Sequence, residues 1–178
     1  MQIVQLGIVV ALLATGPVFA QSPKPVINCL LSDGTRASLL AESSADGKRL
    51  FVNLDKKTQP AFTDMPDTDF VGAVVMAKCA SSSLVFALNY GSPYLKGAVL
   101  RKNPVSHSIE RIDFAEKALP RWLYLGQEQM RLVIPNIGNE VSGKFLVYDY
   151  FAGKGQPEEA SSVDVRPDTH GFKVLRLK

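Results

Sequence analysis

The residues whose types are best suited to chemistry are the two histidines, each of which has a possible partner beside it. One lies in Asp168-Thr169-His170 and the other in Ser106-His107-Ser108. A hydrolytic triad needs a serine, a histidine and a carboxylate that meet in space, and these groups can come from distant segments. Such residues are also common beside turns, so we predict no catalytic residue from these segments. The alternative is that the protein is a hydrolase whose catalytic site no sequence motif marks.

Metal and cofactor chemistry has weaker support in the sequence. The acidic segment 64–69 carries Asp64, Asp67 and Asp69, and oxygen-rich loops of this kind can hold Ca²⁺. Its spacing departs from the EF-hand pattern, and Pro66 restricts the backbone, so a solvated acidic turn is the simpler interpretation. The chain also lacks the phosphate-binding and dinucleotide-binding glycine patterns. We therefore expect no metal and no cofactor.

A binding surface is the remaining source of function. Tyrosine and tryptophan beside turns are typical anchors of protein interfaces, because they bury much area at low entropy cost. The composition of the loop 135–143 predicts a long, flexible segment, and in inhibitors such a loop can enter a partner's cleft. The alternative is that the turn-borne aromatics only cover the ends of the core. Arg101, Lys102 and Arg121 could add a charged rim to such a surface. The residues predicted to contact a protein partner are Tyr90, Tyr94, Arg101, Lys102, Arg121, Trp122, Asn136 and Asn139.

The charge distribution argues against nucleic acid as that partner. The chain has 20 basic and 17 acidic residues, which gives a formal net charge of +3. Basic residues occur as pairs such as Lys48-Arg49 and Lys56-Lys57, whereas a nucleic-acid binder carries a denser basic stripe.

The N-terminus has the pattern of an export signal. An apolar run over 3–14 is followed by Gly16-Pro17, and Val18-Phe19-Ala20 places small residues where signal peptidase cuts. The run is too short to span a bilayer, which takes about 20 residues. We predict a cleaved signal peptide over 1–20 and a single β-rich domain over 21–178, in the periplasm or, alternatively, secreted. Because Asn28 precedes Cys29, we expect no lipid anchor.

Cys29 and Cys79 are the two cysteines of the chain. In an exported protein, two cysteines most simply form one disulfide. The alternative, a reactive or metal-binding thiol, lacks a C-x-x-C motif to support it.

Short apolar runs separated by glycine, proline, asparagine or aspartate dominate the mature chain. Asp33-Gly34 and Asp46-Gly47 supply the left-handed backbone conformations that tight turns need, so they predict hairpins. The expected strands are 26–31, 36–41, 50–54, 70–77, 84–90, 98–101, 109–114, 122–125, 130–134, 145–151 and 172–177. The valine-rich run 70–77 reads as a strand buried on both faces, and only 114–119 favours a helical turn.

About ten short strands at this spacing predict an all-β fold, an antiparallel sandwich or barrel with one disulfide. The alternative is a small propeller-like stack of sheets.

For function we infer an exported, non-enzymatic protein, best described as a periplasmic inhibitor or immunity protein that neutralises a cell-wall hydrolase or toxin by direct binding. An accessory cell-envelope component that binds peptidoglycan or polysaccharide is the alternative. The sequence indicates no oligomeric state.

Overall fold

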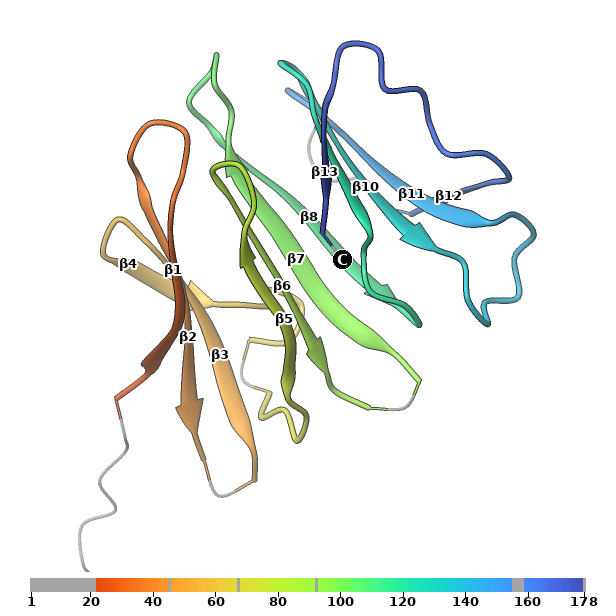
Figure 1. The fold of residues 1–178 in the computed structure, drawn as a ribbon. Helices are drawn as coiled ribbons and strands as arrows, with labels where there is room; N and C mark the ends of the chain where they lie inside the picture. Colours follow the sequence, from red (N-terminus) through yellow and green to blue (C-terminus); the bar gives the residue numbers. More distant parts are fainter. Residues whose placement is uncertain (1–21, 45, 67, 92, 155–158, 178) are drawn as a thin grey trace, which may run out of the picture.

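The computed structural model describes residues 22–44, 46–66, 68–91, 93–154 and 159–177. These residues form thirteen strands in three antiparallel sheets, and each sheet is built from consecutive strands (Figure 1). The prediction of an all-β antiparallel fold is confirmed. The expected signal peptide, residues 1–20, lies outside the described residues.

The sheets follow one another along the chain. The first sheet has the order β1-β2-β3-β4, with β1 (Lys24–Leu30), β2 (Arg36–Ser43), β3 (Lys48–Leu54) and β4 (Lys57–Pro60). The middle sheet has the order β5-β6-β7-β8, with β5 (Val74–Cys79), β6 (Ser83–Asn89), β7 (Leu95–Lys102) and β8 (Ile109–Glu116). The third sheet has the order β12-β11-β10-β9-β13, with β9 (Trp122–Leu125), β10 (Gln129–Pro135), β11 (Phe145–Phe151), β12 (Ser161–Val163) and β13 (Lys173–Arg176).

The middle sheet is covered on both faces. Along β6, Leu84 and Phe86 pack into the core shared with the first sheet, whereas Val85 and Ala87 pack into the core shared with the third. This alternation follows from the two-residue period of a strand, whose successive side chains point to opposite faces. Figure 1 shows the first and third sheets on opposite sides of the middle sheet, so the stack has one layer more than a two-sheet sandwich.

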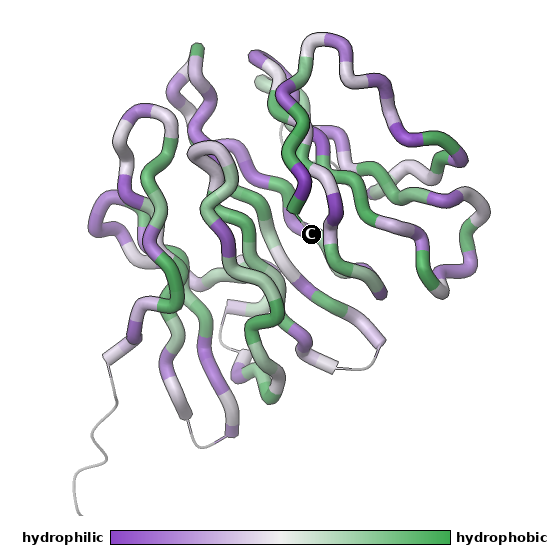
Figure 2. Tube along the Cα trace, viewed as in Figure 1, coloured by the Kyte–Doolittle hydropathy of each residue, from purple (hydrophilic) through white to green (hydrophobic). Residues whose placement is uncertain are grey.

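The two outer faces of the stack differ. The segment 164–172 crosses the outer face of the third sheet, where the Tyr124 hydroxyl donates to the Pro167 carbonyl at 3.3 Å and the Phe172 ring lies 5.8 Å from the Tyr124 ring. The outer face of the first sheet carries polar pairs, such as Ser38 donating to the Asn28 side chain at 2.6 Å. Figure 2 shows hydrophobic residues concentrated along the strands and hydrophilic ones in many of the turns.

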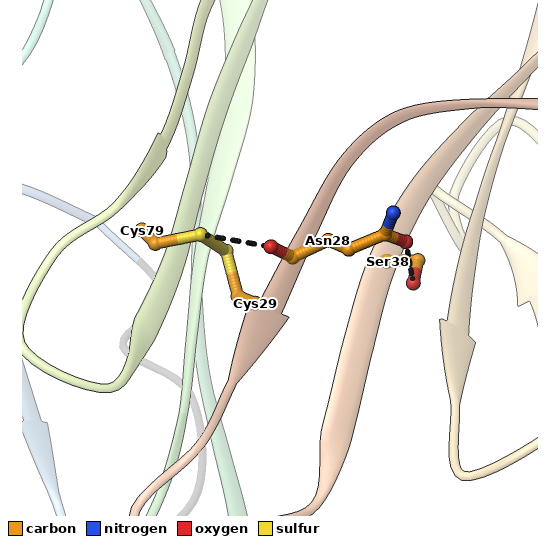
Figure 3. The surroundings of a disulfide bond; sticks show 4 residues. All are labelled: Asn28, Cys29, Ser38 and Cys79. Carbon is orange, nitrogen blue, oxygen red and sulfur yellow. Dashed lines mark hydrogen bonds between the residues drawn. A yellow bond between two sulfur atoms is a disulfide. The ribbon is translucent and has the colours of Figure 1, made fainter.

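The predicted disulfide is confirmed. Cys29 in β1 and Cys79 in β5 are joined, and these are neighbouring edge strands of the first and middle sheets (Figure 3). The Cys79 sulfur lies 3.3 Å from the backbone oxygen of Asn28. A disulfide sulfur carries no hydrogen, so this approach is a contact and not a donated hydrogen bond. The bond adds a covalent link to the apolar packing between these two sheets.

Three details differ from the sequence-based predictions. The strands β4 and β12 are additional. The run expected as a doubly buried strand becomes β5, an edge strand with Val75 42% exposed, and the doubly buried strand is β6. Residues 114–119 form no helical turn, because β8 continues to Glu116, which pairs with Leu95 of β7.

Candidate functional site

The residues predicted to contact a partner fall in separate places. Tyr94 and Asn139 line one cleft. They belong to the β6–β7 and β10–β11 turns, and Figure 1 shows both turns at the lower end of the stack as drawn. Arg101 and Lys102 line another cleft at the upper end. Tyr90 packs edge-on against Phe70, with ring centroids 6.3 Å apart, and so belongs to the core between the first two sheets.

Two of these predictions need correction on exposure. Arg101 is only 4% exposed, because it pairs with a buried glutamate, so it does not contribute to a solvent-exposed charged rim. Trp122 lies on the outer face of the third sheet with the Arg166 guanidinium 4.7 Å above its ring and Phe145 5.7 Å away. Arg121 approaches the same ring at 5.6 Å. Trp122 is therefore a packed side chain, not a free anchor.

The cleft at the lower end, here called the lower cleft, has a volume of about 460 Å³. It lies between the end of the middle sheet and the β10–β11 loop of the third. The residues that line it are Tyr94, Glu116, Lys117, Asn139, Glu140, Val141, Leu146, Tyr148, Glu159 and Ala160. Its size falls within the range of small-molecule sites in proteins.

The floor of the lower cleft holds a buried acid. Glu116 and Tyr148 are each 8% exposed, and the Tyr148 hydroxyl donates to Glu116 Oε1 at 2.5 Å. Burial raises the pKa of Glu116, because desolvation outweighs the opposing effect of the tyrosine hydrogen bond. Burial, followed by the neighbouring carboxylate, raises the pKa of Tyr148. Glu116 therefore retains a proton more readily than a glutamate in solvent, which is a property of general acids.

The wall of the lower cleft is the β10–β11 loop, residues 136–144, which is held in one conformation by its own hydrogen bonds. The Asn136 side-chain amide donates to the carbonyls of Val141 at 2.9 Å and Gly143 at 2.8 Å. The backbone of Asn136 donates to Lys144 at 2.9 Å, which closes the loop. Gly143 has φ 102° and lies so close to Ser162 that a Cβ would meet its hydroxyl at 2.3 Å, so only glycine fits.

This loop presents two apolar side chains to solvent. Ile137 is 61% exposed and Val141 is 53% exposed. Lys117 ties the loop to the middle sheet, since its ammonium donates to the Gly138 carbonyl at 2.5 Å and lies 5.5 Å from the Tyr94 ring. Tyr94 is 41% exposed, so tyrosine, loop and lysine form one surface beside the cleft.

The side chains considered for metal binding or for a catalytic triad are not arranged for either role in the described residues. Asp64 pairs with Lys96 at 2.5 Å and Asp69 with Arg49 at 2.7 Å, and these hydrogen bonds lower the pKa of both carboxyls. Asp67 lies outside the described residues. Within the described ranges, no group of three or more metal-binding side chains is found. Over the same ranges, neither histidine ring has a hydrogen bond to a serine or a carboxylate, so the structure does not assemble a triad there.

The sequence did not indicate Glu116, Tyr148, Ile137 or Val141. The two buried residues come from β8 and β11, and their meeting depends on how the second and third sheets pack. The exposed pair lies in the loop that the sequence singled out, but Asn136 fixes this loop, whereas composition alone suggested a flexible one.

Comparison with protein-family models, curated proteins and solved structures found no match. In the part of the chain that the structure describes, no helix is long and apolar enough to cross a membrane.

Proposed function

We propose that the protein is an exported, non-enzymatic binding protein, in the periplasm, that neutralises a cell-wall hydrolase or toxin by direct binding. The observation that carries this proposal is the β10–β11 loop, which holds Ile137 and Val141 in solvent in a fixed conformation. A loop already ordered before binding loses little conformational entropy on association, so more of its contact energy appears as affinity.

The surroundings of the loop fit an inhibitor. Apolar residues at the centre of an interface, with aromatic residues nearby and charges at the rim, are the usual arrangement of a binding hot spot. Here Ile137 and Val141 form the apolar centre, Tyr94 is the adjacent aromatic, and Lys117 and Glu140 carry charge beside them. The partner that fits this surface is an enzyme with an apolar substrate cleft wide enough to accept the loop.

The test uses the mature, oxidised chain as bait in an envelope extract, followed by mass spectrometry and an activity assay of the captured protein. We expect one stoichiometric hydrolase or toxin whose activity falls when the protein is added. The double variant I137D/V141D should lose both capture and inhibition. The matched control is V105D, since Val105 is 64% exposed but lies in the β7–β8 turn at the opposite end of the stack.

Two outcomes would overturn the proposal. One is capture of peptidoglycan fragments or many envelope proteins, which would favour the accessory envelope component. The other is a partner that I137D/V141D and V105D retain equally well, which would place the interface elsewhere.

A second candidate, a hydrolase, is favoured by the raised pKa of Glu116 in a cleft that also holds Glu140 and Glu159. Paired carboxyl groups are the catalytic groups of glycoside hydrolases. If this candidate is correct, the purified protein should cleave peptidoglycan or polysaccharide on its own, and E116Q should abolish that activity without loss of folding. An inactive wild-type protein would eliminate it.

A further inference from the structure

The upper end of the stack carries a second cleft, here called the upper cleft, with a volume of about 390 Å³. Turns and strand ends from all three sheets contribute to it, and Figure 1 shows several of these turns at the same end of the stack. The residues that line it are Ser32, Ser81, Ser82, Ser83, Arg101, Lys102, Pro104, Leu125, Gly126, Gln127, Gly171 and Lys173. Four serines and three cationic side chains face one hollow.

Arg101 is the buried cation of this cleft. Its Nε donates to Glu110 Oε2 at 2.5 Å and its Nη1 donates to the Gly126 carbonyl at 2.8 Å. The other carboxylate oxygen of Glu110 accepts from the Asn103 side chain at 2.6 Å. These contacts fix the guanidinium and leave Nη2 buried with no hydrogen-bond partner among the described residues.

Ser83 lies directly across the strand pair from Arg101, and it is fully buried. Its hydroxyl is likewise without a partner in the described part of the chain. Buried donors that lack partners are rare in proteins, because each one loses its hydrogen bonds to water on folding. Arg101 Nη2 and the Ser83 hydroxyl are neighbouring donors in this state, both on residues that line one cleft, so a molecule bound there can supply the acceptor that they lack.

The rim of the upper cleft adds positive charge and hydroxyl groups. Lys173 donates to the Ser81 hydroxyl at 2.6 Å, and Lys102 donates to Thr35 at 3.0 Å and pairs with Asp33. Three positive charges lie at the cleft, on Arg101, Lys102 and Lys173. Two carboxylates, Asp33 and Glu110, pair with them. The local balance of +1 favours an anion.

The turn that carries two of the serines is strained for its sequence. Ser81 and Ser82 have φ angles of 44° and 61°, and Ala80 and Ser83 exchange both backbone hydrogen bonds across them. A two-residue turn of this geometry favours Asn-Gly, because other residues are disfavoured in the left-handed region. Unfavourable backbone conformations of this kind cluster at functional sites, and here they place two hydroxyls at the cleft.

We propose that the upper cleft binds a tetrahedral oxyanion, a phosphate or sulfate group. Arg101 Nη2 and the Ser83 hydroxyl would donate to it from the floor of the cleft, and Lys173 with the hydroxyls of Ser81 and Ser82 would donate from the rim. A tetrahedral anion suits this set better than a carboxylate, because it offers three or four acceptor oxygens to donors that surround it. The group can be a free ion or part of a larger molecule, and this site is independent of the proposed inhibitor loop.

The test is calorimetric titration of the mature, oxidised protein with inorganic phosphate and with sulfate, in chloride buffer of constant ionic strength. We expect saturable binding in the millimolar range or tighter. The variants S83A and K173Q should each weaken it roughly tenfold, the loss expected for one hydrogen bond to a charged group. The matched control is K144Q, which neutralises a lysine in the β10–β11 loop at the opposite end of the stack. This variant should bind both anions as the wild type does.

Titration with phenyl phosphate separates the two sources of the anion. If the monoester binds at least as tightly as inorganic phosphate, the site accepts a phosphate carried on a larger molecule; if it does not bind, the ligand is the free ion. The proposal is overturned if neither phosphate nor sulfate gives a saturable signal, or if S83A and K173Q bind both anions as well as the wild type does.

Discussion

Removal of the disulfide tests how the first two sheets depend on each other. The Cys29–Cys79 bond closes a loop with a sequence separation of 50 residues. In the chain-entropy model, closing such a loop in the unfolded state stabilises the native state by about 4 kcal/mol. We therefore expect reduced wild-type protein to lose about 4 kcal/mol of unfolding free energy. The variant C29A/C79A should lose somewhat more, because Cys29 is 4% exposed and alanine leaves a small void in the core.

Urea unfolding with two probes is the appropriate assay. The single tryptophan of the chain, Trp122, begins β9 and reports on the third sheet, whereas far-ultraviolet circular dichroism reports on all three. Because the middle sheet shares a core with each neighbour, we expect the two transitions to coincide with and without the bond. A loss below about 1 kcal/mol would refute the entropic argument. A circular dichroism transition that moves to lower urea while the Trp122 transition stays in place would refute the cooperative stack.

Three further predictions concern side chains described above. Since burial raises the pKa of Glu116, its stabilising contribution is complete below the ordinary glutamate pKa of 4.5 and is lost as pH rises through the folded-state pKa. Thermal unfolding should therefore show E116Q more stable than the wild type at pH 8, with this advantage gone at pH 4. E110Q should lose about 3 kcal/mol in urea unfolding, because it leaves the buried charge of Arg101 uncompensated; a loss of a few tenths would contradict this. S81N/S82G should gain about 1 kcal/mol by relieving the strained turn, and a destabilised variant would show that the serines make contacts that offset the strain.

Strands and the disulfide could be predicted where the sequence carries a recognisable local pattern, such as a turn motif, a cysteine pair or an apolar alternation. The Asp-Gly turns identified the first two hairpins, and two cysteines in a chain predicted to be exported identified the disulfide. The strands β4 and β12 were missed because their sequences, Lys-Thr-Gln-Pro and Ser-Ser-Val, lack the apolar alternation that marks a half-buried strand. They are strands because each pairs with a longer neighbour.

The sites were harder to predict, because they depend on how sheets pack. Tyr94 and Asn139 were chosen as turn residues, and both line the lower cleft. Arg101 was chosen for its charge as a rim residue, but the strand register places it opposite Ser83 and Glu110, away from solvent. A sequence pattern gives the face on which a side chain lies, whereas the cross-strand neighbour requires the register. The buried donors of the upper cleft follow from that register.

The division of the sheets along the chain has a consequence for how the fold is reached. Paired strands within each sheet are neighbours in sequence, except that β13 pairs with β9, so most pairing within a sheet closes short loops at low entropic cost. That β9–β13 pairing and the docking of one sheet on the next are the steps that bring distant residues together. During synthesis from the N-terminus, β1 to β4 emerge first but cannot bury their apolar face until β6 and β7 follow. Cys29 stays a free thiol until Cys79 has been synthesised, so oxidation before that point would link Cys29 to a cysteine of another chain instead of to Cys79.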